Sequence, residues 1–253
     1  MVWCSGWRLA AAVSNAGGLG LLGAGSMHPE TLREHIRKCH EATHHAFGVN
    51  IPLMYPQIEE IMQIVADEGV KIVFTSAGSP KKWTGWLHER GITVVHVVSS
   101  SRFAVKAEEA GVDAVVAEGF EAGGHNGREE TTTLCLIPAV RAVTTLPLIA
   151  AGGIATGEAM LAARVLGAEG VQIGTRFALT AESSANEVFK DYCLHLEEGD
   201  TRLLLKKLAP VRLVRNNFRS AVEAAEAVGA SEEELRILLG RGRAKRGIFE
   251  GDL

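Results

Sequence analysis

Short continuous runs of apolar residues alternate with amphipathic stretches along most of the chain. Seven of these runs are bounded by glycine, proline or polar residues: Gly18–Gly23, Phe47–Leu53, Lys71–Ser76, Thr93–Val98, Asp113–Glu118, Pro147–Gly153 and Gly170–Thr175. Their apolar residues are continuous rather than alternating, which is typical of strands that are covered by helices and packed in a core. The pattern therefore predicts a parallel α/β architecture.

Segments with a helical spacing of apolar residues separate the predicted strands. They cover residues 7–16, 29–43, 57–68, 80–90, 101–110, 134–143 and 157–166. The distance from one strand to the next, about 20 to 35 residues, favours a TIM (β/α)8 barrel over a doubly wound sheet. Only seven strands are recognisable, and the chain starts with a helix-like segment. We therefore expect a barrel whose first strand is missing from this chain.

The pattern changes after Phe177, where charged helical stretches begin. They cover residues 184–198, 201–207, 220–228 and 231–239. The last stretch starts with Ser231-Glu-Glu-Glu, a capping residue followed by an acidic first turn, and Gly240 is a suitable stop. We predict a barrel over residues 1–179 and a helical lid or appendage over residues 180–253, which we expect to be incomplete at its C-terminal end.

Composition limits the classes of partner. The 253 residues are 47% hydrophobic and carry a net charge of −4, which gives no electrostatic reason to expect a nucleic acid or an anionic membrane as partner. The four cysteines lack metal-like spacing, and no apolar run approaches the roughly 18 residues of a membrane span. With no signal region at the start, the expected location is cytoplasmic.

Histidines crowd the segment around the second predicted helix, at positions 35, 40, 44 and 45, and His40 and His44 stand four residues apart. Such spacing occurs in metal sites, but no carboxylate or cysteine completes a ligand set. A solvated helix face is the preferred interpretation, and we expect no metal site.

A glycine-rich turn with one histidine follows the fifth predicted strand. Residues 117–127 read Ala-Glu-Gly-Phe-Glu-Ala-Gly-Gly-His-Asn-Gly. The glycines leave space for a flat ligand, and the imidazole of His125 can titrate near neutral pH. His125 is therefore the candidate catalytic residue, although a turn histidine bonded to the backbone would give the same pattern.

Two further glycine-rich turns follow the last two predicted strands. Gly152 and Gly153 lie in the first of them and Gly174 in the second. In a TIM barrel these loops, with the N-terminus of a following helix, form the usual phosphate site. Tight strand-to-helix turns alone would also explain the glycines. Because both turns occur where the barrel requires them, we predict a phosphate-bearing cofactor.

Five motifs in this order resemble a known family. They are Asn15-Ala-Gly-Gly-Leu-Gly, Phe47-Gly-Val-Asn, Glu121-Ala-Gly-Gly-His-Asn-Gly, Ala150-Ala-Gly-Gly-Ile-Ala and Gln172-Ile-Gly-Thr-Arg-Phe. Together they resemble the nitronate monooxygenase (2-nitropropane dioxygenase-like) flavoproteins, and the related flavin-dependent enoyl-ACP reductase II enzymes share the pattern. The resemblance covers nearly the whole chain.

The resemblance implies an FMN-binding TIM barrel with the flavin over its C-terminal mouth. His125 matches the catalytic histidine of the family. The cofactor-binding positions that it implies are Asn50, Glu118 and Gly123 near the flavin, and Gly152, Gly153, Gln172, Gly174 and Thr175 near the ring and phosphate. Two departures stand out. The family usually opens with a strand ending in Gln-Gly-Gly/Pro-Met, of which this chain retains at most Met1, and position 118 is often Gln where this chain has Glu.

Three functions remain open. The preferred one is FMN-dependent oxidation of a nitronate or nitroalkane by O2. The alternative is an FMN- and NAD(P)H-dependent enoyl-ACP reductase, and the third is a truncated barrel without cofactor or activity. The physiological substrate, the use of NAD(P)H, a homodimer and the role of Glu118 are left undecided by the sequence.

Overall fold

Seven strands form one parallel sheet in the order β1-β2-β3-β4-β5-β7-β8. The computed structural model describes residues 1–253. The strands are β1 (Gly20–Gly23), β2 (Phe47–Pro52), β3 (Ile72–Ser76), β4 (Thr93–Val98), β5 (Ala114–Glu118), β7 (Leu148–Ala151) and β8 (Gly170–Gln172). Each strand lies within a predicted apolar run, so the prediction of a parallel α/β architecture is confirmed.

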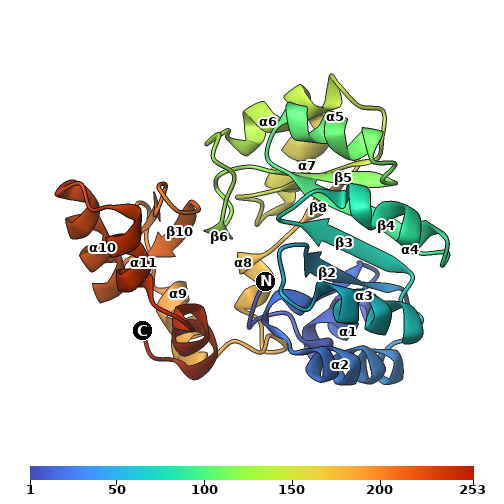
Figure 1. The fold of residues 1–253 in the computed structure, drawn as a ribbon, viewed down its shortest axis with the longest axis horizontal. Helices are drawn as coiled ribbons and strands as arrows, with labels where there is room; N and C mark the ends of the chain where they lie inside the picture. Colours follow the sequence, from blue (N-terminus) through green and yellow to red (C-terminus); the bar gives the residue numbers. More distant parts are fainter.

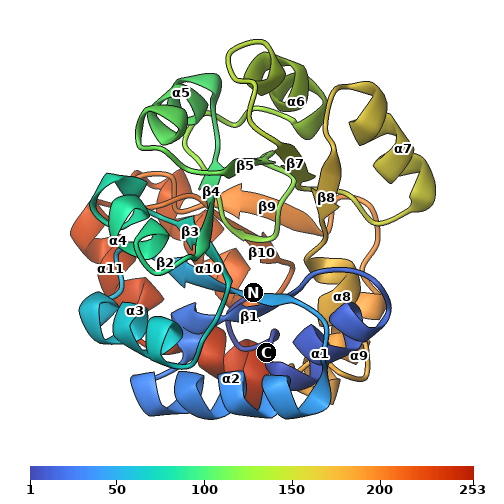
Figure 2. The same cartoon turned by 90° about the vertical axis from the view of Figure 1, so that its right-hand side faces the viewer.

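Helices surround the outside of this curled sheet (Figure 2). They are α1 (Trp7–Asn15), α2 (Pro29–Ala42), α3 (Ile58–Asp67), α4 (Thr84–His88), α5 (Ser101–Glu109), α6 (Thr133–Arg141) and α7 (Gly157–Val165), with short 3-10 turns η1 (Ala24–Ser26) and η2 (Pro80–Lys82). The arrangement is a TIM-barrel-like α/β fold in which β1 and β8 are the two edge strands. No helix combines the length and the apolar character that crossing a bilayer requires.

The two faces of the sheet pack against different cores. The larger core lies between the strands and the helices and includes Val73, Val115 and Leu136. A smaller core fills the inside of the curl, where Phe74, Val95, Ala114, Val116 and Ala151 meet. Side chains alternate between the faces of a strand, so any residue in register with this second group also faces the interior of the barrel.

One polar pair is buried on the helix-covered face. The Thr75 hydroxyl lies 2.7 Å from Nδ1 of His96 on the neighbouring strand. Burial lowers the pKa of His96 to about 4, so this imidazole is neutral at physiological pH. The contact gives each of these buried polar side chains a hydrogen-bond partner within an apolar layer, and both side chains lie outside the interior of the barrel.

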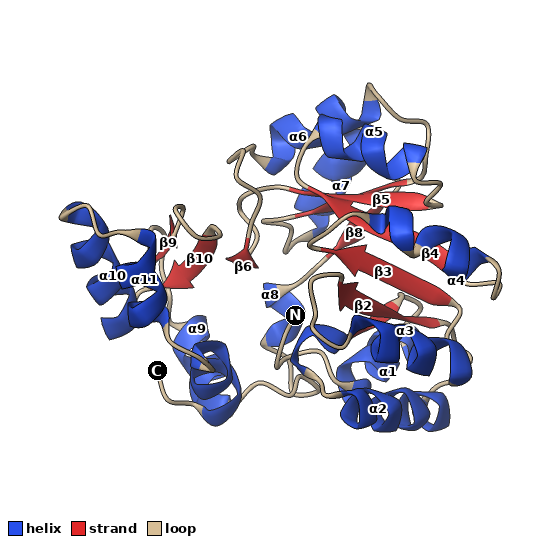
Figure 3. Ribbon diagram, in the orientation of Figure 1, coloured by secondary structure: helices blue, strands red, loops and turns tan.

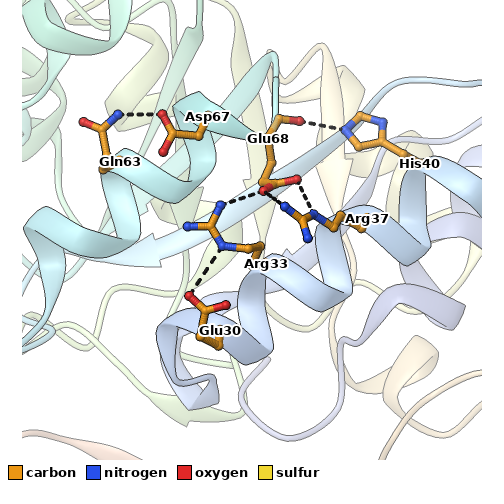
Figure 4. A network of polar contacts seen from close by, with 7 residues as sticks. All are labelled: Glu30, Arg33, Arg37, His40, Gln63, Asp67 and Glu68. Atoms are coloured by element: carbon orange, nitrogen blue, oxygen red, sulfur yellow. Dashed lines mark hydrogen bonds and ion pairs between the residues drawn. The ribbon is translucent and has the colours of Figure 1, made fainter.

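An ion-pair cluster fastens α2 to the end of α3 (Figure 4). The Glu68 carboxylate accepts from Arg33 Nη1 at 2.7 Å and from Arg37 Nη2 at 2.8 Å. His40 Nε2 lies 3.1 Å from the carbonyl oxygen of Glu68. Because α3 leads into the N-terminal end of β3, this cluster lies at the end of the barrel where residues support stability rather than chemistry.

A second sheet joins the barrel to the C-terminal part of the chain (Figures 1 and 3). Its strand order is β6-β10-β9, with β6 at Gly124–His125, β9 at Thr201–Leu204 and β10 at Val211–Val214. The remaining elements are α8 (Thr175–Ala178), α9 (Glu187–Leu194), α10 (Asn217–Ala227), α11 (Glu232–Leu239) and a π-helix, η3 (Lys245–Glu250).

The prediction of a helix over residues 201–207 was wrong. Residues 201–204 pair in antiparallel register with β10, and Leu204 is buried against Val222 and Leu235 of the following helices. Pairing with a strand that sequence inspection did not recognise overrides the local helical pattern. The predicted helix start at Ser231 is confirmed, because Ser231 and Glu234 form a complete capping box.

Candidate active site

Three strands end in one row of residues at the C-terminal edge of the barrel sheet. Glu118 of β5 is in register with Ala151 of β7, which is in register with Gln172 of β8. Ala151 belongs to the interior core, so Glu118 and Gln172 also face the interior, two strand spacings or about 10 Å apart. Asn50 of β2 is in register with Phe74 and faces the same interior.

The turn after β7 packs closely against the turn after β5. Gly152 has φ +100°, and a Cβ atom there would lie 2.7 Å from the Gly119 carbonyl oxygen. Gly153 has φ +68°, and its Cβ would lie 3.1 Å from the Glu121 side chain. Side chains rarely adopt these backbone conformations, so both positions favour glycine, and at Gly152 the approach of a backbone oxygen also leaves no room for a Cβ atom.

The turn after β8 meets the same cluster. A Cβ atom on Gly123 would lie 3.4 Å from the Thr175 hydroxyl, and one on Gly174 would lie 3.6 Å from the Met1 sulfur. The structure therefore brings together the glycines of all three turns with Thr175, close to the row of Glu118 and Gln172.

Unpaired hydrogen-bonding groups line these turns. No backbone amide from Gly152 to Thr156, and neither amide of Ile173 and Gly174, donates a hydrogen bond within the chain. Oε1 of Gln172 is buried without a donor. Free amides at a strand-to-helix turn suit a phosphate, and a buried amide oxygen suits the N–H group of a planar ring.

Glu121 and Thr133 connect two of the turns. Both carboxylate oxygens of Glu121 accept from the Thr133 backbone amide, at 3.1 and 3.0 Å, and so cap the start of α6. The Thr133 hydroxyl lies 2.9 Å from Glu121 Oε2 and 2.9 Å from the Gly152 carbonyl oxygen. Sequence reasoning assigned no role to Thr133. Its position at the start of a predicted helix was the available signal.

His125 lies on β6, outside the barrel sheet, where its backbone pairs with Val211 of β10. Asn126 stabilises the turn by donating from Nδ2 to the carbonyl oxygens of Ala122, at 2.8 Å, and Gly124, at 2.9 Å. The His125 ring makes no hydrogen bond within the chain, so the turn leaves it available to a ligand. The His125 side chain is exposed at the surface, but desolvation by the surrounding protein lowers its pKa below the ordinary value, which favours the neutral imidazole at pH 7.

Glu118 is an acid in a desolvated position. Burial raises the pKa of its carboxyl above the ordinary value for glutamate. A protonated carboxyl presents both an O–H donor and an acceptor oxygen, as the amide of glutamine does. The departure from Gln at position 118 thus preserves both hydrogen-bonding functions while the acid stays protonated.

We expect Glu118→Gln to stabilise the protein more at pH 8 than at pH 4.5. The pKa of Glu118 is higher in the folded protein than in the unfolded chain, so ionising this carboxyl lowers the free energy of unfolding. This loss of stability is absent below the pKa of the unfolded chain and grows as the pH rises toward the folded pKa. Scanning calorimetry of the cofactor-free protein at the two pH values measures the effect. Glu41→Gln, at an exposed position, is the control. An equal shift in Tm at both pH values would contradict the prediction.

A family model described as "Nitronate monooxygenase" matches residues 1–247 of the chain. The chain belongs to the nitronate monooxygenase family. Members of this family are flavin enzymes, and the chain is accordingly a flavin-dependent oxidoreductase. Its similarity to a probable nitronate monooxygenase from Staphylococcus aureus is 32% identity over 238 residues, covering 77% of this chain and 67% of that protein.

Two other proteins that are similar to this chain carry different names. The structure of FabK, an enoyl-ACP reductase II, from Thermotoga maritima is similar with a TM-score of 0.92 and 42% identity, covering 100% of this chain and 80% of FabK. A Mycobacterium tuberculosis protein named (3aS,4S,5R,7aS)-5-hydroxy-7a-methyl-1-oxo-octahydro-1H-indene-4-carboxyl-CoA dehydrogenase is 36% identical over 193 residues, covering 75% of this chain and 54% of that protein.

Proposed function

We propose that the chain binds FMN and reduces the carbon–carbon double bond of an enoyl thioester with electrons from NAD(P)H. The observation that carries this proposal is the likeness to FabK, which reaches 42% identity and extends over the whole chain, the C-terminal elements included. The Mycobacterium tuberculosis relative is also named for an acyl thioester, a carboxyl-CoA compound. Both relatives exceed the 32% identity of the Staphylococcus aureus protein.

The turns at the mouth of the barrel fit a flavin nucleotide. We assign the phosphate to the free amides of Gly152, Gly153 and Gly174, with the Thr175 hydroxyl beside them. The flavin ring is assigned to the interior row, where Gln172 Oε1 is a buried acceptor without a donor. Asn50 and Glu118 face the same interior, and Gly123 leaves the ring room beside Thr175.

When bound, FMN supplies hydride transfer between the nicotinamide and the double bond. The chain itself supplies orientation and proton control. The neutral ring of His125 can donate a hydrogen bond to the thioester carbonyl oxygen, where negative charge develops during reduction. Asn126 keeps this ring at the end of the turn by holding two backbone carbonyls.

Nitronate or nitroalkane oxidation by O2 is the second candidate. The family description and the Staphylococcus aureus relative favour it. The lowered pKa of His125 also favours it, because a neutral imidazole at pH 7 can accept the α-proton of a nitroalkane.

Anaerobic titration of the FMN-loaded protein separates the two activities. We expect NADH or NADPH to bleach the flavin absorbance and crotonyl-CoA to restore it in the absence of O2. Bleaching by propyl-2-nitronate alone, with no response to either nicotinamide, would favour the second candidate. A colourless protein that cannot be loaded with FMN would contradict both candidates and favour a cofactor-free barrel.

A further inference from the structure

The turn that carries His125 is bound to the C-terminal elements as well as to the barrel. Its strand β6 pairs with β10, in the registers Val211–His125 and Arg212–Gly124. The Asn126 amide, next to the histidine, donates to the Pro210 carbonyl oxygen at 2.9 Å. The placement of His125 over the mouth therefore depends on residues more than 80 positions further along the chain.

Arg212 holds both ends of this turn. Its Nε and Nη2 donate to the Phe120 carbonyl oxygen at 3.2 and 2.7 Å, and its guanidinium lies 5.2 Å from the centre of the Phe120 ring. Its backbone is in register with Gly124, at the other end of the turn. Nη1 donates to the Thr201 hydroxyl of β9 at 3.2 Å, which fixes the guanidinium within the hairpin.

Glu121, the residue that follows Phe120, is tied to the barrel. Glu121 accepts from the amide at the start of α6, whereas Phe120 is bound by Arg212 of the C-terminal hairpin. The Arg212 contact is therefore made at the point where the turn leaves the barrel, directly beside the barrel anchor. Two nitrogens on one carbonyl, combined with the aromatic contact, restrict both distance and orientation there.

We propose that Arg212 is a positioning residue that sets the location of the His125 ring relative to the mouth of the barrel. The proposal rests on the proposed function, because it requires His125 to act in the reaction. Arg212 itself need not touch the substrate. Without its guanidinium, β6 keeps its short pairing with β10 but loses the anchor at Phe120, and the ring moves from its productive position. Misplacement by about 1 Å can cost about 100-fold in rate.

Steady-state kinetics of three variants test the proposal. We expect Arg212→Met to lower kcat about 10- to 100-fold with KM and FMN content nearly unchanged, and Arg212→Lys to recover part of the loss. Arg202→Met is the matched control, since Arg202 lies on β9 of the same hairpin and pairs only with Glu223, at 3.3 Å. Rates are measured with crotonyl-CoA plus NADPH and with propyl-2-nitronate plus O2, so that either activity tests the role.

A double variant distinguishes positioning from general damage. If Arg212 acts through His125, His125→Ala combined with Arg212→Met has the same kcat as His125→Ala alone. Multiplied losses in the double variant, or an unchanged kcat in Arg212→Met, would overturn the proposal. If His125→Ala alone retains full activity, the role of His125 in the proposed function fails, and the role of Arg212 fails with it.

Hydrogen–deuterium exchange gives a measurement that is independent of activity. We expect Arg212→Met to speed exchange of the amides from Gly119 to Gly127, and Arg202→Met to leave them unchanged. Unchanged exchange in Arg212→Met would show that the turn does not depend on the guanidinium and would overturn the proposal.

Discussion

We expect His125→Ala to lower kcat about 100-fold or more while FMN remains bound, since acid–base side chains typically contribute a factor of about 100 to 10,000. The ring makes no hydrogen bond within the chain, so its removal leaves no buried partner unsatisfied. The free amides assigned to the phosphate lie in the turns after β7 and β8 and are unaffected by the change.

Flavin absorbance and steady-state rates measure the two parts of this prediction. His44→Ala is the control, because His44 is an exposed histidine beyond the end of α2. A variant that binds FMN and turns over at the rate of the unmodified protein would remove His125 from the mechanism. Loss of FMN together with loss of rate would show that the ring supports the cofactor site instead.

Replacing Gly152 by alanine is expected to weaken FMN binding about 100-fold or more. The backbone at φ +100° is strained for any residue with a side chain, at a cost of about 1 to 3 kcal/mol. The new methyl group would also lie 2.7 Å from the Gly119 carbonyl oxygen and 2.9 Å from the Thr133 hydroxyl. Either the turn after β7 or the turn after β5 must therefore move, and the free amides lose their arrangement.

Gly157→Ala is the matched control in the same loop region. Gly157 is the first residue of α7, has no unusual φ, and has no atom within 4 Å of the position that a Cβ would take. Alanine there is expected to leave FMN affinity unchanged and to stabilise the helix by up to about 1 kcal/mol. Titration of the cofactor-free variants with FMN, followed by fluorescence, measures both affinities. Wild-type affinity in Gly152→Ala would contradict the close packing of the two turns.

Local sequence was sufficient to predict the barrel elements. Apart from β8, the barrel strands are largely buried on both faces, so their apolar runs are continuous. Helices such as α1 and α5 begin at the predicted residue and end one residue early. The hairpin of β9 and β10 was missed because each strand has four residues and mixes charged with apolar side chains. Its stability comes from pairing between the two strands and from packing on the following helices α10 and α11, which the pattern within each strand does not record.

The residues of the candidate site also fall into those that local sequence could place and those that it could not. Glu118 and Gln172 could be placed together because parallel strands end at one edge, and the glycines because their turns follow those strands. The assignment of these residues to FMN, and of His125 to catalysis, came from the family resemblance and stays a prediction. Arg212 has no such signal, because its partner Phe120 lies 92 positions away and the bond is made to a backbone oxygen.

The pairing of β6 with β10 also sets an order of events during synthesis. Val211 follows His125 by 86 positions, so the ribosome must synthesise β10 before β6 can pair with it. The βα units of the barrel close much shorter loops and can assemble earlier, at a lower entropic cost. A nascent chain released before residue 211 would therefore carry every glycine turn of the mouth but would lack the partner strand of its histidine.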